Sequence, residues 1–234
     1  MTPDSGAAPA ITLTGVSKRL GRETVLKRID LEVASGRLVV LRGSNGAGKT
    51  TMLRLLATRL RPTAGSGAIF GHDLVGEQDA VRGRIGVLAG LGGNYPVLSA
   101  RENLTLALRL SGGRNGGTFS VDDALRSVGL AGEGEKLVRA FSSGMKKRLG
   151  LARQLLLDPD LWLLDEPHAA LDEDGKALVD SQVMAARERG RTVLMSSHEG
   201  ERHTLQPDAV VLLHGGVLEL LAAAPTSNSA GAAR

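Results

Sequence analysis

Residues 43 to 50 read Gly43-Ser44-Asn45-Gly46-Ala47-Gly48-Lys49-Thr50, and they are the strongest indication of fold in the sequence. It follows the apolar run 38–41 and precedes the leucine-rich run 52–56, which suits a helix. Strand, glycine loop and helix in this order form the context in which the pattern G-x-x-x-x-G-K-S/T binds phosphate. The glycines let backbone N–H groups turn inward around phosphate oxygens, and the helix adds the positive end of its dipole. We therefore expect a nucleotide phosphate site here.

The side chains of this loop suggest how a triphosphate is held. Lys49 is expected to reach the β- and γ-phosphates, and the Thr50 hydroxyl is expected to hold Mg²⁺. The other expected nucleotide contacts are Gly43, Ser44, Asn45, Gly46, Ala47, Gly48 and Thr51. The alternative is a chance match in a chain with 31 glycines, which the flanking pattern disfavours.

A second apolar strand, at 161–164, ends in two carboxylates, Asp165 and Glu166. Open α/β sheets bind ligands at the carboxyl edge, where such a strand delivers its last residues. Asp165 is expected to hold Mg²⁺ through water, and Glu166 to polarise an attacking water. The alternative is a pair of solvated acids at an ordinary strand end, which the upstream phosphate loop disfavours.

The run Phe141-Ser142-Ser143-Gly144-Met145 opens a predicted helix shortly before these carboxylates. Alone, Ser-Ser-Gly is a helix-capping pattern. A helix N-terminus that carries Ser142 and Gly144 is also suited to bind a second set of phosphate oxygens. Its position before Asp165 and Glu166 favours the second interpretation.

Composition limits the class of protein. A length of 234 residues suits one domain, whose core must be aliphatic because hydrophobic residues make up 42% and aromatic residues 2%. The absence of cysteine excludes disulfides, thiolate metal sites and a thiol nucleophile. A net charge of +4 suits an anionic membrane surface or nucleic acid, or else simply an arginine-rich proteome. We see no apolar run of about 18 residues and no secretory signal.

Short apolar runs alternate with helical patterns along the chain. Helices are predicted after Lys49, Ser99, Ser120, Ser143 and Glu173, and Ser99 with Glu102 predicts a capping box. Strands are predicted at 11–13, 25–33, 38–41, 85–88, 161–164, 192–195 and 209–213. The alternation predicts an α/β domain with a mainly parallel sheet core and an antiparallel β subdomain. We expect a single domain over 11–221 with a helical subdomain at about 99–142, and disordered tails at 1–10 and 222–234.

Taken together, the motifs resemble an ATP-binding cassette (ABC) ATPase, the motor subunit of ABC transporters, over about residues 11–220. The family order continues with 169–172 as the D-loop and with His198 as the switch histidine. The resemblance implies an ABC-type P-loop fold that binds ATP and Mg²⁺. It implies catalytic roles for Lys49, Glu166 and His198, and places Asp172 at the nucleotide.

The family resemblance also implies partners. Two copies are expected to form a head-to-tail homodimer in which ATP on Lys49 of one subunit meets Ser142, Ser143 and Gly144 of the other. Integral membrane permease subunits are expected, which places the chain peripherally on the cytoplasmic face of the cell membrane. No nucleic-acid partner is expected. A soluble ABC ATPase unconnected with transport, or a regulator that does not hydrolyse ATP, is the alternative.

Two positions depart from the family pattern. Leu20 stands where relatives often carry an aromatic residue that stacks on adenine, so the base is expected to be held less tightly. Gly90 stands where many relatives carry a glutamine that senses Mg²⁺ and water and contacts the transport partner. Whether Gly90 weakens that coupling is left open. The signature carries Ser143 and Met145 where glycine and glutamine are usual.

A narrower resemblance links the chain to the ATP-binding subunit of the haem exporter of cytochrome c maturation. It rests on the run 42–51, the missing glutamine, the Ser-Ser-Gly-Met signature, and the acidic runs 165–167 and 171–175. It implies haem export as the function. Exporters of drugs, lipids or polysaccharides use similar short cassettes and remain alternatives.

Overall fold

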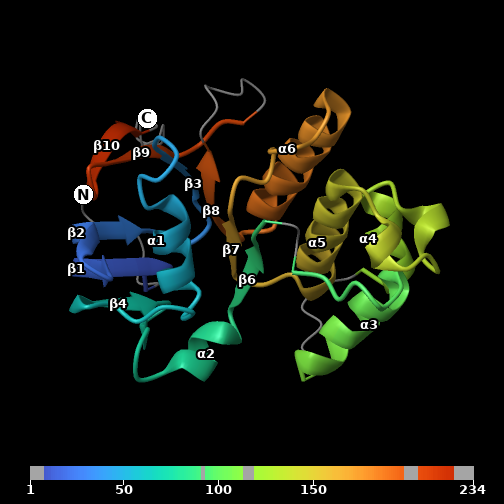
Figure 1. Cartoon of the computed structure of the whole chain (residues 1–234), viewed down its shortest axis with the longest axis horizontal. Helices are drawn as coiled ribbons and strands as arrows, with labels where there is room; N and C mark the ends of the chain where they lie inside the picture. Colours follow the sequence, from blue (N-terminus) through green and yellow to red (C-terminus); the bar gives the residue numbers. More distant parts are fainter. Residues whose placement is uncertain (1–7, 91–92, 113–118, 198–204, 224–234) are drawn as a thin grey trace, which may run out of the picture.

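The structure is a computed structural model that describes residues 8–90, 93–112, 119–197 and 205–223. Two sheets carry the fold (Figure 1). The first, of order β2-β1-β4-β5, is antiparallel, with β1 (Ile11–Leu20), β2 (Glu23–Val33), β4 (Ala64–Ile69) and β5 (His72–Asp73). The second has the order β10-β9-β3-β8-β7-β6, with β3 (Leu38–Arg42), β6 (Ile85–Leu88), β7 (Leu161–Leu164), β8 (Thr192–Ser197), β9 (Ala209–His214) and β10 (Val217–Ala223).

Five neighbouring strands of the second sheet, from β9 to β6, run parallel, and β10 is antiparallel to β9. The helices are α1 (Lys49–Leu56), α2 (Gln78–Arg82), α3 (Ala100–Leu110), α4 (Val121–Ser127), α5 (Ser143–Leu157) and α6 (Glu173–Glu188), with short 3₁₀ turns at Ala131–Glu133 and Val138–Ala140. The α/β class with a mainly parallel core is confirmed. Among the described helices, none has the length and apolar character needed to cross a membrane.

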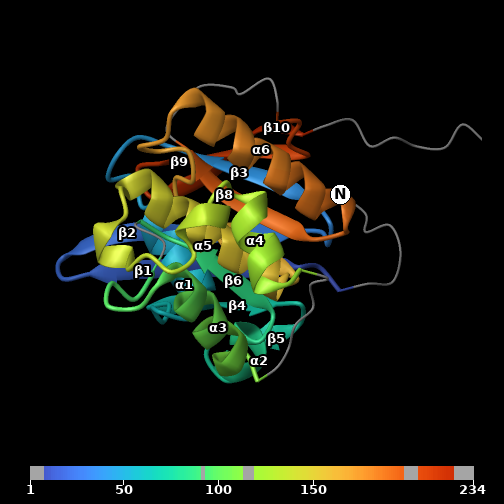
Figure 2. The same cartoon turned by 90° about the vertical axis from the view of Figure 1, so that its right-hand side faces the viewer.

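The parallel sheet is buried on both faces, and this explains its continuous apolar strands. Side chains alternate along β7, so that Trp162 and Leu164 enter one core while Leu161 and Leu163 enter the other. The first core includes residues of α3, α4, α5 and α6, and the second includes residues of α1 and the antiparallel sheet. Figures 1 and 2 show this arrangement, with α1 on the side of β1 and β2, and α3 to α5 on the other side.

The helices begin where the sequence places their caps. Ser99 and Glu102 form the predicted capping box, in which the Ser99 hydroxyl accepts from the Glu102 N–H and the Glu102 carboxylate accepts from the Ser99 N–H. Ser120 caps α4 in the same way with Asp123. Ser142 caps α5 by accepting from the Met145 N–H at 3.2 Å.

Four elements were not expected from the sequence: β4, β5, α2 and β10. Strand β4 is rich in glycine and alanine, and it is defined by its pairing with β1 rather than by its own composition. Strand β10 runs to Ala223, beyond the boundary expected at 221. Its residues Ala222 and Ala223 pair with Val210 and Ala209, so backbone hydrogen bonding to β9 extends the strand.

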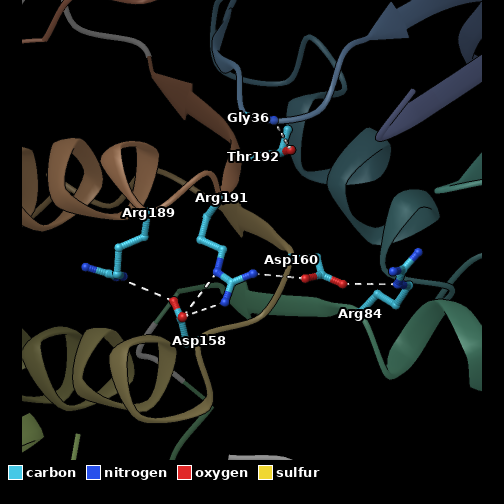
Figure 3. Close-up of polar contacts among 7 residues, drawn as sticks. All are labelled: Gly36, Arg84, Asp158, Asp160, Arg189, Arg191 and Thr192. Atoms are coloured by element: carbon cyan, nitrogen blue, oxygen red, sulfur yellow. Dashed lines mark hydrogen bonds and ion pairs between the residues drawn. The ribbon is translucent and has the colours of Figure 1, made fainter. Parts of the chain in front are cut away.

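Charged side chains join the amino ends of β6, β7 and β8 (Figure 3). Arg191 donates to Asp158 at 2.7 Å and to Asp160 at 3.1 Å. Asp160 also accepts from Arg84 at 3.0 Å, and Arg189 approaches Asp158 at 3.5 Å. Hydrogen bonding to Asp158 raises the pKa of Arg191. The network ties three strands together at one edge of the sheet.

We predict that Asp158→Asn lowers the free energy of unfolding by about 2 kcal/mol, because the buried carboxylate is lost beside Arg191 and Arg189. The left-handed backbone at this position, with φ 41, suits asparagine, so the effect comes from the charge. Urea unfolding measures it. The control is Asp79→Asn, which removes a fully exposed partner of Arg82 and should cost almost nothing. Equal losses in the two variants would contradict the role given to the network.

Candidate functional site

A cavity of about 670 Å³ opens at the carboxyl edge of the parallel sheet, opposite the network of Figure 3. Its walls come from β1, β2, the loop that joins β3 to α1, the start of α1, the segment after β6, helix α5 and the segment after β7. The lining residues are Leu20, Glu23, Val25, Ser44, Asn45, Gly46, Ala47, Gly48, Lys49, Thr50, Thr51, Gly90, Lys147, Asp165, Glu166, Ala169 and Ala170. This edge is where open α/β sheets bind ligands.

The glycine loop between β3 and α1 needs glycine at two positions. A Cβ on Gly43 would lie 2.5 Å from the Leu213 carbonyl oxygen of β9. Gly48 has φ +106, and a Cβ there would lie 3.0 Å from Cγ1 of Val25. Gly48 is also the N-cap of α1, so the loop ends with the free N–H groups of a helix N-terminus. The backbone therefore forms a site suited to an anion.

Lys49, the first residue of α1, is a buried cation directly after this loop, with a side chain 5% exposed. Its ammonium group donates to the carbonyl oxygens of Gly43 at 2.7 Å and Ser44 at 3.2 Å. It also lies 3.5 Å from the carboxylate of Glu166, whose side chain is 33% exposed. The amine is thus held at the floor of the cavity beside the carboxylate that the sequence assigns to catalysis.

Thr50 and Asp165 meet although they are far apart in the sequence. The Thr50 hydroxyl donates to Oδ2 of Asp165 at 2.8 Å, and the Ser196 hydroxyl donates to Oδ1 at 2.8 Å. These contacts fix the Asp165 carboxylate at the end of β7. Mg²⁺ prefers oxygen ligands such as hydroxyl and carboxylate groups. Thr50 and Asp165, the two residues expected to hold Mg²⁺, therefore fit that ion.

Glu166 directly follows Asp165 and has a left-handed backbone, with φ 47. For a non-glycine residue this conformation costs about 1 kcal/mol or more, and it is retained where surrounding contacts hold it. The Glu166 N–H donates to the Ser196 hydroxyl at 2.9 Å. On the other side, Lys147 donates its amine to the Glu166 carbonyl oxygen at 2.6 Å.

Lys147 is a site residue that the sequence reasoning missed. A helical projection puts Met145, Leu149, Ala152 and Leu156 on one apolar stripe and Lys147 off it, yet Lys147 is 7% exposed and lines the cavity. Burial lowers the pKa of its amine, while the nearby Glu166 and Asp165 oppose that shift. Its position one helical turn after Ser143 was the available signal.

Ser142, Ser143, Gly144 and Asp172 lie apart from the lining of this cavity. Ser142 and Ser143 are exposed at the start of α5. A Cβ on Gly144 would lie 3.4 Å from Leu171, so this helix start packs on the segment after β7. Asp172 caps α6 by accepting from the Gly175 N–H at 2.9 Å. Within one chain, the glycine loop 43–48 and the helix start at 142–144, both expected to bind phosphate, are therefore not brought together.

Three further residues were singled out from the sequence: Leu20, Gly90 and His198. Leu20 lines the cavity and is 43% exposed. Gly90 also lines it, with φ +52 and open space around its Cβ position. His198 lies outside the described residues.

The site thus combines an anion-binding loop, a buried amine, a pair of oxygen donors for a divalent cation and a carboxylate 3.5 Å from the amine. The loop and Lys49 suit a polyphosphate. The Glu166 carboxylate suits a water molecule that attacks the terminal phosphate. This is the geometry of phosphoryl transfer to water.

Comparison with known proteins agrees with this chemistry. Residues 26–169 match the family model described as ABC transporter. The chain is 40% identical to the daunorubicin resistance ATP-binding protein DrrA3 of Streptomyces coeruleorubidus, over 90% of this chain and 67% of that protein. It is 35% identical to the cytochrome c biogenesis ATP-binding export protein CcmA of Pseudomonas putida, over 78% of this chain and 84% of that protein.

The fold has solved counterparts. One is a dimeric ATP-binding cassette in a post-hydrolysis state, bound to ADP and Pi, which superposes with a TM-score of 0.79 at 25% identity. The match covers 91% of this chain and 99% of that chain.

Proposed function

We propose that this chain, which belongs to the ABC transporter family and is an ATP-hydrolysing motor subunit of that family, drives export of a small amphiphilic compound through an integral membrane permease. The likeness to DrrA3 supports this cargo class, because that relative is by name a daunorubicin resistance protein and matches 90% of the chain. Haem export, the narrower expectation, is supported only by the lower identity and shorter match to CcmA. It is kept as the second candidate.

The observation that carries the catalytic part of the proposal is the meeting of Lys49, Thr50, Asp165 and Glu166 in one cavity. The loop and Lys49 hold the triphosphate of ATP, and Glu166 orients the attacking water. Thr50 and Asp165 would hold Mg²⁺, which when bound neutralises charge on the β- and γ-phosphates. His198 is assigned to the γ-phosphate on the family resemblance.

We further propose that hydrolysis takes place in a head-to-tail homodimer on the cytoplasmic face of the membrane. Two observations support the dimer. The tip 142–144, exposed at Ser142 and Ser143, lies apart from the cavity of its own chain, and a cassette of similar fold has been solved as a dimer. A second copy would bring this tip to the ATP on Lys49, so closure would couple hydrolysis to the permease.

We predict that Ser142→Arg leaves ATP binding by the monomer intact but prevents dimer closure, because a long cation replaces a small cap at the proposed interface. Size-exclusion chromatography with ATP, in a Glu166→Gln background, measures closure. The matched control is Ser120→Arg, which removes the equivalent cap at the start of α4 and should still dimerise. A Ser142→Arg dimer that forms as readily as the control would disprove the cross-subunit arrangement.

The cargo is tested by transport. The chain is co-expressed with a candidate permease, and inverted vesicles are given ATP with either daunorubicin or haem. ATP-dependent uptake of daunorubicin supports the first candidate, and uptake of haem alone supports the second. Uptake of neither, by vesicles that hydrolyse ATP, would reject both cargo assignments. Vesicles that carry the Lys49→Ala variant are the control, and their uptake measures the background that does not depend on this ATPase.

A further inference from the structure

The backbone of Glu166 is held from both sides by side chains of other elements. Its N–H donates to the Ser196 hydroxyl of β8 at 2.9 Å. Its carbonyl oxygen accepts from the Lys147 amine of α5 at 2.6 Å and from the Ala169 N–H at 3.2 Å. Between these contacts the residue keeps its left-handed conformation, with φ 47. The direction in which its carboxylate leaves the chain depends on this conformation.

Burying the amine of Lys147 to make one hydrogen bond costs desolvation free energy. The side chain is buried, and burial lowers the pKa of its amine, which means that the folded state disfavours the charged form. An apolar side chain of the same length would avoid that desolvation cost. The residue therefore does not suit a purely stabilising role, and its placement calls for another explanation.

We propose that Lys147 is a positioning residue for Glu166: its amine anchors the Glu166 carbonyl and so aims the carboxylate at the water that attacks ATP. The inference rests on the proposed function, in which Glu166 orients that water. Lys147 lies one turn beyond the tip at 142–144 on the same helix. Lys147 therefore links two parts of the same subunit. One is the tip 142–144, which is proposed to meet the ATP bound by the partner, and the other is Glu166 in the subunit's own site.

The test compares ATP turnover with nucleotide affinity and stability in the full-length chain. Lys147→Met keeps the length of the side chain but removes the donor. We expect kcat to fall about 10- to 100-fold, the range that corresponds to one hydrogen bond made by a charged group. ATP affinity and the thermal midpoint should stay the same, or the midpoint should rise. Lys147→Arg keeps a charged donor and should retain kcat within about threefold.

Two controls separate this inference from its premise. Lys136→Met makes the same replacement at an exposed lysine paired with Glu133 and should leave kcat unchanged. Glu166→Gln is measured alongside, and normal hydrolysis by that variant would reject the premise rather than the positioning role. In the Glu166→Gln background, Lys147→Met should change the residual rate by less than about twofold, because both changes act on one group.

Four results would overturn the proposal. The first is an unchanged kcat in Lys147→Met while Glu166→Gln is slow. The second is a parallel loss of kcat, ATP affinity and stability, which would indicate a structural role. The third is an equally large effect of Lys147→Met with and without the Glu166 carboxylate. The fourth is the same loss of kcat in Lys147→Arg as in Lys147→Met.

Discussion

Glu166→Gln is expected to slow ATP hydrolysis by about 10²- to 10⁴-fold while ATP still binds. The amide retains the size of the side chain, and the backbone contacts to Ser196 and Lys147 do not involve the replaced atom. What is lost is the group that accepts hydrogen bonds from water and can take its proton. The pair with Lys49, 3.5 Å away, also loses its negative member, which frees the amine to bind phosphate.

Two measurements check this result. Single-turnover hydrolysis gives the rate of the chemical step, and isothermal titration gives the ATP affinity, which should be equal to or tighter than that of the unchanged chain. A slow variant should also accumulate as a closed dimer with ATP, visible by size-exclusion chromatography. The control is Glu133→Gln, at a carboxylate paired with Lys136 outside the cavity lining. Hydrolysis at the normal rate would remove Glu166 from the catalytic role.

The parallel half of the fold was predictable because each buried strand is a short, continuous apolar run. The runs at β7 and β8 have no competing pattern, and Ser99 and Ser142 mark helix starts by their capping chemistry. Strand β4 was not predictable, since Ala64-Gly65-Ser66-Gly67-Ala68 resembles a loop until β1 pairs with it. Local sequence does not contain that long-range pairing.

The site, like the fold, has features that the sequence predicts and features that it does not. The meeting of Thr50 with Asp165 follows from topology, because the segments after parallel strands converge at one edge of the sheet. The role of Lys147 did not follow, since a helical projection places it with other basic residues off the apolar stripe. The side chain is buried, and its amine donates to the carbonyl oxygen of Glu166, a residue with a left-handed backbone. Sequence periodicity predicts the helix, but it does not predict that the segment after β7 packs on it.

Lys49→Ala is expected to lower ATP affinity by at least about 100-fold, because truncating one partner of a desolvated charge pair costs several kcal/mol. The amine is 5% exposed and is already held at the loop by the carbonyl oxygens of Gly43 and Ser44. Its side chain has therefore lost its freedom before ATP arrives, and little ordering cost remains at binding. Without the amine, the phosphates would face two carbonyl oxygens and the Glu166 carboxylate with no cation between them.

The variant is tested by isothermal titration with ATP and by thermal unfolding. Alanine is a good helix former at the start of α1, so the fold should survive and any loss of binding reports on the site. Lys176→Ala, which removes a lysine paired with Glu173 on α6, should bind ATP normally. Lys49→Arg keeps the charge but not the compact ammonium geometry, and we expect it to bind between the two. ATP affinity in Lys49→Ala within a few-fold of the unchanged chain would show that the triphosphate is held elsewhere.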